Sequence, residues 1–149
     1  MRVGVIGVGA MGLAMAGHIR ASGHEVWATD IDAAARAAAG AAGLGVSDTL
    51  DDIAPRAEVF VVVVATDAQS ETVTRGLLTA GVAQGSVIAV AATNRPDTMV
   101  ALEGVCRTRG VGFIDAPVCY GMQGAIHGTL GSLVGGDAVH VERARPVLA

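Results

Sequence analysis

The sequence predicts an α/β fold: a doubly wound, parallel sheet of the Rossmann type with helices on both faces. Short apolar segments alternate along the whole chain with segments of helical length, which is typical of repeated βα units. The segment 58–65 (EVFVVVVA) is apolar at successive positions, as expected for a strand buried on both faces. The 149 residues correspond to one domain, and no linker or low-complexity segment divides them.

In the first half of the chain, glycine and capping residues mark where each element ends. Gly7 closes the first strand, the Ser22-Gly23 pair ends the first helix, and Asp32 is a suitable N-cap for the second. We expect strands at Val3–Ile6, Glu25–Thr29, Gly43–Val46 and Glu58–Ala65, and helices at Ala10–Ala21, Asp32–Ala41 and Asp48–Ala54.

The second half continues the same alternation. Pro96 suits the first turn of a helix, and the Gly-rich segment 121–128 reads as a loop with a short helical piece. We expect helices at Asp67–Thr79, Pro96–Arg109 and from Asp137 onward, and strands at Ser86–Val90, Val111–Ile114 and Leu130–Val134.

Composition argues against several classes of partner. The net charge is −4 and the ten basic residues, all arginine, are scattered, so we expect no nucleic acid partner. The longest apolar run, 59–65, is far shorter than the roughly 20 residues of a membrane helix. Cys106 and Cys119 lack a CxxC partner and read as reduced thiols of a cytoplasmic protein. The four histidines have no metal-site spacing, so we expect no metal.

A glycine-rich turn carries the clearest functional signal. The Gly7-x-Gly9-x-x-Gly12 pattern follows an apolar strand directly and opens a helix, which is the context of a dinucleotide-binding loop. Gly7 permits the tight turn, Gly9 lets a pyrophosphate approach the backbone, and Gly12 allows close packing of helix on strand. FAD uses the same pattern, usually in larger proteins. A turn without any ligand is the other alternative. The loop that we expect to contact the cofactor comprises Gly7, Val8, Gly9, Ala10, Met11 and Gly12.

An acidic residue at the end of the second predicted strand indicates which dinucleotide binds. Asp30 lies 18 residues beyond Gly12, where a carboxylate accepts the ribose hydroxyls of NAD and repels the 2′-phosphate of NADP. The next residues are Ile31 and Asp32, with no arginine immediately after them. We therefore expect NAD rather than NADP, with Asp30 and Ile31 contacting its adenosine half.

A second segment, 113–130 (FIDAPVCYGMQGAIHGTL), resembles a motif of the β-hydroxyacid dehydrogenase family, D-A-P-V-S-G-G-x-x-G-A-x-x-G-T-L. The opening segment GVIGVGAMGLAMAGHIRASGHEV and residues 134–137 (VGGD) are also similar to that family. The family includes 3-hydroxyisobutyrate dehydrogenase, tartronate semialdehyde reductase and 6-phosphogluconate dehydrogenase. The resemblance covers the whole chain and implies an NAD-dependent oxidoreductase that acts on a small β-hydroxyacid-like carboxylate.

The resemblance also implies roles for particular positions. Val64, Ala65 and Gln69 correspond to cofactor contacts, and Thr93 keeps a hydroxyl on the nicotinamide side. Consecutive small residues after a strand expose backbone N–H groups, and the family uses this loop to hold the acid group of the substrate. The matching substrate-binding residues are Cys119, Tyr120 and Gly121. Cys119 replaces the usual serine and Tyr120 replaces a glycine, so the substrate is left open.

The chain contains no lysine, whereas the resemblance implies a lysine acid/base contributed by a second, all-helical domain. We therefore expect no catalytic residue in this chain, which would be the N-terminal, cofactor-binding domain (1–149) of a homo-oligomeric enzyme whose C-terminal helical domain lies outside it. Two alternatives stay open: a stand-alone, non-catalytic NAD-binding module, and an imine-reductase-like enzyme whose proton donor need not be lysine.

Overall fold

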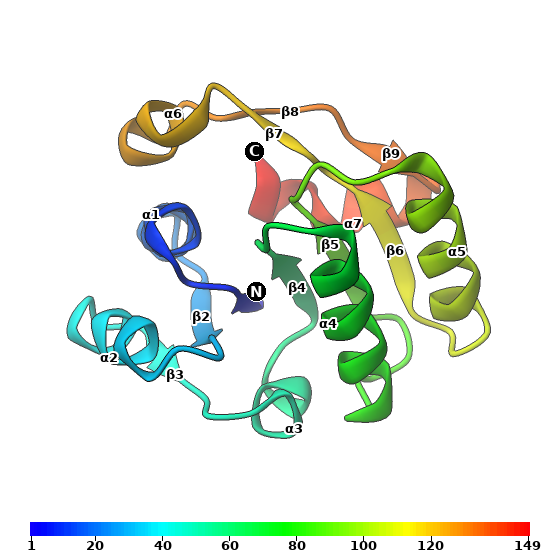
Figure 1. Cartoon of the computed structure of the whole chain (residues 1–149), viewed down its shortest axis with the longest axis horizontal. Coiled ribbons are helices and arrows are strands. Elements are labelled where there is room, and N and C mark those ends of the chain that lie inside the picture. The colour runs from blue at the N-terminus through cyan, green and yellow to red at the C-terminus, as the bar shows by residue number, and fades with distance from the viewer.

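A sheet of seven strands forms the centre of the computed structural model, which describes residues 1–149 (Figure 1). The strand order is β3-β2-β1-β4-β5-β6-β9. The first six strands in this order are parallel, and β9 pairs antiparallel with β6. The strands of this sheet are β1 (Arg2–Ile6), β2 (Glu25–Thr29), β3 (Gly45–Val46), β4 (Val59–Val62), β5 (Val87–Val90), β6 (Gly112–Asp115) and β9 (Gly135–Gly136).

Helices cover both faces of this sheet, which confirms the predicted doubly wound fold. Helices α1, α2 and α7 share one buried cluster with the sheet, and α3, α4 and α5 share the other. Figure 1 shows α4 and α5 together on one side of the strands. The helices are α1 (Ala10–Ala21), α2 (Ala33–Ala41), α3 (Leu50–Ile53), the 3-10 turn η1 (Ala54–Arg56), α4 (Asp67–Thr79), α5 (Pro96–Arg107), α6 (Gly121–His127) and α7 (Ala138–Leu148).

The central strand β4 explains why the sequence reads as continuously apolar there. Val59 and Val61 point into the cluster with α1 and α7, while Phe60 and Val62 point into the cluster with α4 and α5. All four side chains are completely buried. Because successive residues of a strand face opposite sides, a sheet covered on both faces needs an apolar residue at every position.

Strands β1, β2 and β4 end at the same level, so the turns that follow these three strands lie side by side. Ile6, the last residue of β1, pairs with Thr29 of β2 and with Val62 of β4. Strand β1 has β2 on one side and β4 on the other, so the order of the strands reverses at β1. Ligands of open α/β sheets bind at this kind of switch point, outside the carboxyl ends of the strands.

Several element boundaries differ from those predicted. Strand β4 ends at Val62, so residues 63–65 belong to the following turn rather than to the strand. The predicted strand Leu130–Val134 is confirmed only at Gly131–Ser132, which forms β8, and β9 begins at Gly135. Strand β8 pairs with β7 (Val118–Cys119) in a separate antiparallel ribbon, so these residues do not extend the main sheet.

Other local predictions are confirmed. The Asp32 carboxylate caps α2 by accepting the Ala34 N–H at 2.9 Å. Pro96 is the first residue of α5, a position whose N–H has no partner within the helix, so the missing N–H of proline costs no hydrogen bond. The Gly-rich segment contains the short helix α6, which lies beside α1 (Figure 1). None of the helices has both the length and the apolar character that crossing a membrane requires.

Candidate functional site

The turn between β1 and α1 is shaped by two glycines that leave no room for a side chain. Gly7 has a φ of +90°, and a Cβ added there would collide with the Val63 carbonyl oxygen. A Cβ on Gly12 would collide with the Gly7 carbonyl oxygen. Both collisions are with backbone atoms, which cannot rotate away. The first and third glycines of the pattern are therefore needed to bring helix, strand and turn together.

Gly9 differs from the other two glycines because it faces open space. A Cβ added at Gly9 would meet no atom within 4 Å. Gly9 is also the N-cap of α1 and supplies no side-chain hydrogen bond to that helix. The N–H groups of the first turn of a helix have no partner within it, so those of α1 are available to a ligand. Bare N–H groups and the helix dipole favour an anion such as a pyrophosphate.

Asp30 is held at the end of β2 by two backbone hydrogen bonds. One carboxylate oxygen accepts the Val8 N–H at 2.7 Å, and the other accepts the Asp32 N–H at 2.9 Å. These bonds fix the carboxylate against the glycine turn. Because each oxygen has two lone pairs, both can still accept a hydroxyl hydrogen. The residues present therefore fit the adenosine ribose and pyrophosphate of a dinucleotide.

A groove of about 980 Å³ runs across the carboxyl ends of β1, β2 and β4. This volume lies at the upper end of the range of small-molecule pockets. The groove brings together ten of the predicted cofactor contacts, which are Gly7, Gly9, Ala10, Met11, Gly12, Asp30, Ile31, Val64, Ala65 and Gln69.

The other predicted residues lie outside this groove. Val8 is buried and acts only through the N–H that Asp30 accepts. Thr93 is exposed after β5 and does not line the groove. Cys119 and Tyr120 are also exposed and outside it, together with Gly121.

One residue links the groove to the predicted substrate-binding segment. Met122, in the first turn of α6, lines the groove beside the glycine turn and follows Gly121 directly. The loop from Cys119 to Gly121 therefore continues from the groove wall.

Gln69 supports the groove wall. Its Oε1 accepts the Ala65 N–H at 2.9 Å, which holds the turn after β4 against α4. The neighbouring Asp67 crosses to α5 by accepting the Thr98 hydroxyl at 2.7 Å and the Arg95 N–H at 3.0 Å. These hydrogen bonds lower the pKa of Asp67 below its ordinary value. The two loops that follow β4 and β5 are thus tied together beside the groove.

Tyr120 adopts an unusual backbone conformation for its residue type. Its φ is +74°, the only positive φ in the chain outside glycine. A left-handed conformation is costly for a residue with a bulky side chain. Gly124 and Gly131 make room for it, since a Cβ on Gly124 would lie 3.0 Å from the Tyr120 Cβ and one on Gly131 2.8 Å from its ring. Tyr120 is 75% exposed, so its phenol is available to a ligand.

Two further titratable groups lie near the sheet without a role in the groove. Asp115, the last residue of β6, has one carboxylate oxygen that is buried without a hydrogen-bond partner. Burial raises the pKa of this carboxyl. Burial likewise raises the pKa of the Cys106 thiol to about 12, so this thiol stays protonated and inert.

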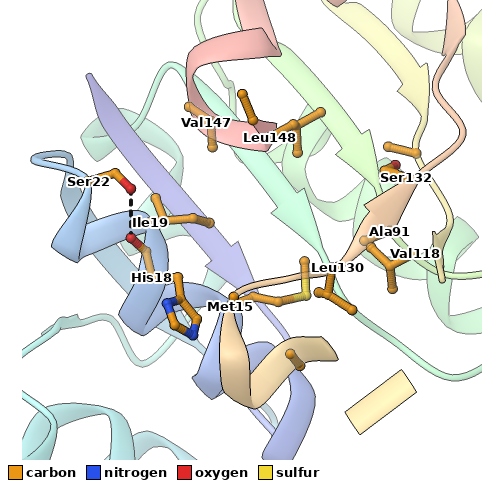
Figure 2. Close-up of a pocket in the computed structure, with 14 residues that line it drawn as sticks. Met15, His18, Ile19, Ser22, Ala91, Val118, Leu130, Ser132, Val147 and Leu148 are labelled. Atoms are coloured by element: carbon orange, nitrogen blue, oxygen red, sulfur yellow. Dashed lines mark hydrogen bonds between the residues drawn. The ribbon is translucent and has the colours of Figure 1, made fainter. Parts of the chain in front are cut away.

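A second, smaller hollow of about 120 Å³ lies between α1, α7 and the β7–β8 ribbon (Figure 2). Most of its wall is apolar, including Met15, Ile19 and Leu130. Its one ionisable side chain is His18, whose Nε2–H donates to the Ile126 carbonyl at 3.1 Å and so joins α1 to α6. The hollow contains neither the glycine turn nor Asp30, so the larger groove is the one that fits a dinucleotide.

Comparison with known proteins agrees with this geometry. The model of the family described as the NAD-binding domain of 6-phosphogluconate dehydrogenase matches residues 2–149. This chain belongs to that family. The 6-phosphogluconate dehydrogenase-type domain is a nicotinamide-dinucleotide-binding domain, and it accounts here for both the glycine turn and the strand order.

Similar proteins share this domain and extend beyond it. An NAD-dependent L-serine dehydrogenase of Pseudomonas aeruginosa is 32% identical over an alignment of 149 positions, which covers 98% of this chain and 50% of the relative. The solved structure of Mycobacterium tuberculosis 3-hydroxyisobutyrate dehydrogenase with L-serine has a TM-score of 0.94 and 28% identity, covering 99% of this chain and 51% of that one. The chain spans about half the length of the relatives that it matches.

An imine reductase from Myxococcus stipitatus, solved with NAD⁺, has a TM-score of 0.89 at 23% identity, over 99% of this chain and 50% of the other. At this identity the likeness shows the shared fold alone.

Within the 6-phosphogluconate dehydrogenase-type domain, several groove residues are not among the predicted contacts. Arg36 lines the groove from α2, Asp48 and Thr49 line it from the turn after β3, and Leu50 lines it from the start of α3. Arg36 comes one helical turn after Asp32, which points it back toward the end of β2. That spacing could have identified Arg36, whereas the position of the β3–α3 turn depends on the packing of the whole sheet.

Proposed function

We propose that this chain is the cofactor-binding half of an NAD-dependent oxidoreductase that acts on a small β-hydroxyacid-like substrate. The observation that carries the proposal is that the Asp30 carboxylate and the open Gly9 backbone share one groove at the switch point of the sheet. That arrangement fits a ribose and a pyrophosphate at the spacing of a dinucleotide.

The chain's own residues would divide the cofactor between them. The first-turn N–H groups of α1 would hold the pyrophosphate, and Asp30 would accept the adenosine ribose hydroxyls. Ile31 is 97% exposed at the mouth of the groove and would pack on the adenine, with Leu50 on the groove wall. When bound, the nicotinamide supplies the hydride chemistry, and the protein contributes position and electrostatics.

NAD is preferred over NADP in this proposal because the Asp30 carboxylate lies where the adenosine ribose would bind. A 2′-phosphate would place negative charge against that carboxylate. No arginine follows Asp30 directly, since Ile31 and Asp32 come next.

The substrate would lie at the loop of Cys119, Tyr120 and Gly121, with Thr93 on the nicotinamide side. Support comes from Met122, which extends this segment to the groove, and from relatives named for L-serine and 3-hydroxyisobutyrate. The Tyr120 phenol offers a side-chain donor that glycine lacks, so we expect a substrate with an additional polar group.

We also infer a further helical domain and a homo-oligomer for the whole protein. The support is the length of the relatives and a group of exposed apolar side chains near α6 and β8, namely Tyr120, Met122, Ile126, Leu133 and Val134. Exposed apolar groups of this kind mark interaction surfaces. Light scattering of the full-length protein should give a multiple of the protomer mass, and a monomer at high concentration would contradict the inference.

A second candidate is a non-catalytic NAD-binding module. The observation in its favour is that the chain has no lysine to act as acid/base and replaces the serine and first glycine of the family's substrate loop. The cytoplasmic location remains a prediction that rests on two free cysteines.

Turnover of the full-length protein separates the two candidates. NAD⁺ reduction would be followed at 340 nm with L-serine, 3-hydroxyisobutyrate and related 3-hydroxy acids, alongside calorimetric titration of NADH. Binding with turnover of at least one 3-hydroxy acid supports the oxidoreductase. Binding without turnover across the series favours the module, and failure to bind NADH would overturn both.

A further inference from the structure

An ion pair lies at the adenosine end of the groove, next to Asp30. The Arg36 Nε is 3.3 Å from a carboxylate oxygen of Asp48, and both residues line the groove. The Arg36 Nη1 donates to the Asp30 carbonyl at 2.7 Å and to the Ile31 carbonyl at 3.3 Å. The guanidinium is thus fixed between the Asp30–Ile31 backbone and Asp48.

This cation is positioned to influence recognition of the ribose. A guanidinium near the end of β2 is the group that Rossmann domains use to bind a 2′-phosphate. The Arg36 side chain is only 21% exposed, and its Nη2 makes no hydrogen bond to the protein. The groove therefore contains both the carboxylate that rejects NADP and a cation that could attract it.

Asp48 determines whether the negative charge of Asp30 or the positive charge of Arg36 dominates in the groove. Its side chain is 81% exposed, so its ion pair with Arg36 contributes little to stability. Its charge nevertheless remains in the groove. The charged side chains that line the groove are Asp30, Asp48 and Arg36, which sum to −1. Without Asp48 the sum is zero, and the guanidinium keeps its Nη1 hydrogen bonds but loses the carboxylate that neutralises its charge.

We propose that Asp48 is a specificity-determining residue, which keeps the groove selective for NAD by neutralising and restraining Arg36. The inference rests on the proposed function and deepens it: discrimination against the 2′-phosphate comes from two carboxylates, on β2 and on the turn after β3. Asp30 repels the phosphate directly, and Asp48 withholds the cation that would offset this repulsion.

Binding measurements on the full chain test the role of Asp48. Dissociation constants for NADH and NADPH are measured for the wild type and for Asp48→Asn. Removing one charge near the phosphate should lower the NADPH dissociation constant about tenfold at low salt, and much less at high salt. The NADH constant should change less than about twofold, because NADH has no 2′-phosphate charge to sense the change.

Asp51→Asn is the matched control. Asp51 is an exposed carboxylate three residues along the same segment, without a hydrogen bond or ion pair, and it does not line the groove. Asp51→Asn removes the same charge from the protein and should leave the dissociation constants for NADH and NADPH unchanged. An equal effect of both variants would reduce the role of Asp48 to net charge and overturn the proposal.

A second variant identifies the cation. Adding Arg36→Gln to Asp48→Asn should abolish the gain in NADPH affinity, and retention of the gain would show that Arg36 does not bind the phosphate. If the wild type binds neither nucleotide, the proposed function fails. If the wild type binds NADH and Asp48→Asn leaves NADPH affinity unchanged, only the present inference fails.

Discussion

The glycine turn at residues 7–12 and the loop at residues 118–121 are both strand-to-helix turns, yet they are built differently. In the first, the positive φ at position 7 falls on a glycine, and each collision that a side chain would cause is avoided. In the second, the left-handed position falls on Tyr120, and glycines elsewhere, at 124 and 131, accommodate it.

We propose that this difference reflects two kinds of ligand, a common cofactor at the first turn and a particular substrate at the second. The pyrophosphate is the same in every dinucleotide, so the turn around it has one solution in backbone geometry. Strain kept at a loop beside a ligand groove is more often connected with function than with stability. We therefore read the nucleotide turn as generic and the Tyr120 loop as the part that sets the substrate.

The largest effect on stability is expected from a substitution that disrupts the glycine turn. Gly12→Ala places a methyl group against the Gly7 carbonyl, which cannot move without displacing β1. We expect a loss of about 3 kcal/mol or more in the free energy of unfolding, because overpacking against backbone finds no relief. Urea denaturation followed by circular dichroism measures it. A loss below about 1 kcal/mol would show that the turn is more tolerant than its geometry implies.

Gly9→Ala should affect binding rather than folding. A Cβ at this position meets no protein atom, so the unfolding free energy should fall by less than about 1 kcal/mol, the cost of alanine as an N-cap. The methyl group enters the space where the pyrophosphate would approach, and NADH should bind at least about tenfold more weakly, as for the loss of one charge-assisted hydrogen bond. Unchanged NADH affinity would place the pyrophosphate elsewhere.

A smaller effect measures the strain at Tyr120. Tyr120→Ala and Tyr120→Gly both remove the ring, but only glycine relieves the left-handed backbone. The glycine variant should therefore be more stable than the alanine variant by about 1 kcal/mol. Thermal unfolding of the two variants gives the difference. Equal stability would mean that the loop carries no strain and that Tyr120 has no special place in the comparison.

The smallest effect concerns Asp115, next to the same loop. Its pKa is raised by burial, so the protonated form is favoured in the folded state. The stability that this group contributes is therefore present below its unfolded pKa and is lost as the pH rises through the folded value. Asp115→Asn should be more favourable relative to the wild type at pH 7 than at pH 3. Denaturation at both values tests this, and the opposite trend would require a partner for the ionised carboxylate.

The parts of the site that could be predicted from sequence are those determined locally. The glycine spacing, the strand before it and Asp30 at the end of the next strand all lie within one βαβ unit, where spacing fixes geometry. Arg36 and Asp48 could not be paired in this way, because they come from different elements that only the folded sheet brings within 3.3 Å.

The elements of the fold that depend on contacts distant in sequence were also not predictable. The apolar residues of buried strands such as β4 predict them, but the strand predicted at 130–134 shortens to β8 (131–132) in the separate ribbon, and the strand that joins the main sheet, β9, begins only at Gly135. Strands of two residues, mostly glycine or serine, have no periodicity to read, and their pairing is decided by long-range backbone hydrogen bonds. The left-handed backbone of Tyr120 was likewise not predictable from residue type, which argues against it.

We propose that Asp30 and the glycine turn form a preformed NAD site. Calorimetric titration of the full chain with NADH and with NADPH, for the wild type and for Asp30→Asn, tests it most directly. We predict that the wild type binds NADH at least about tenfold more tightly than NADPH, and that Asp30→Asn loses most of this preference. Tighter binding of NADPH by the wild type, or a preference unchanged in Asp30→Asn, would contradict the account.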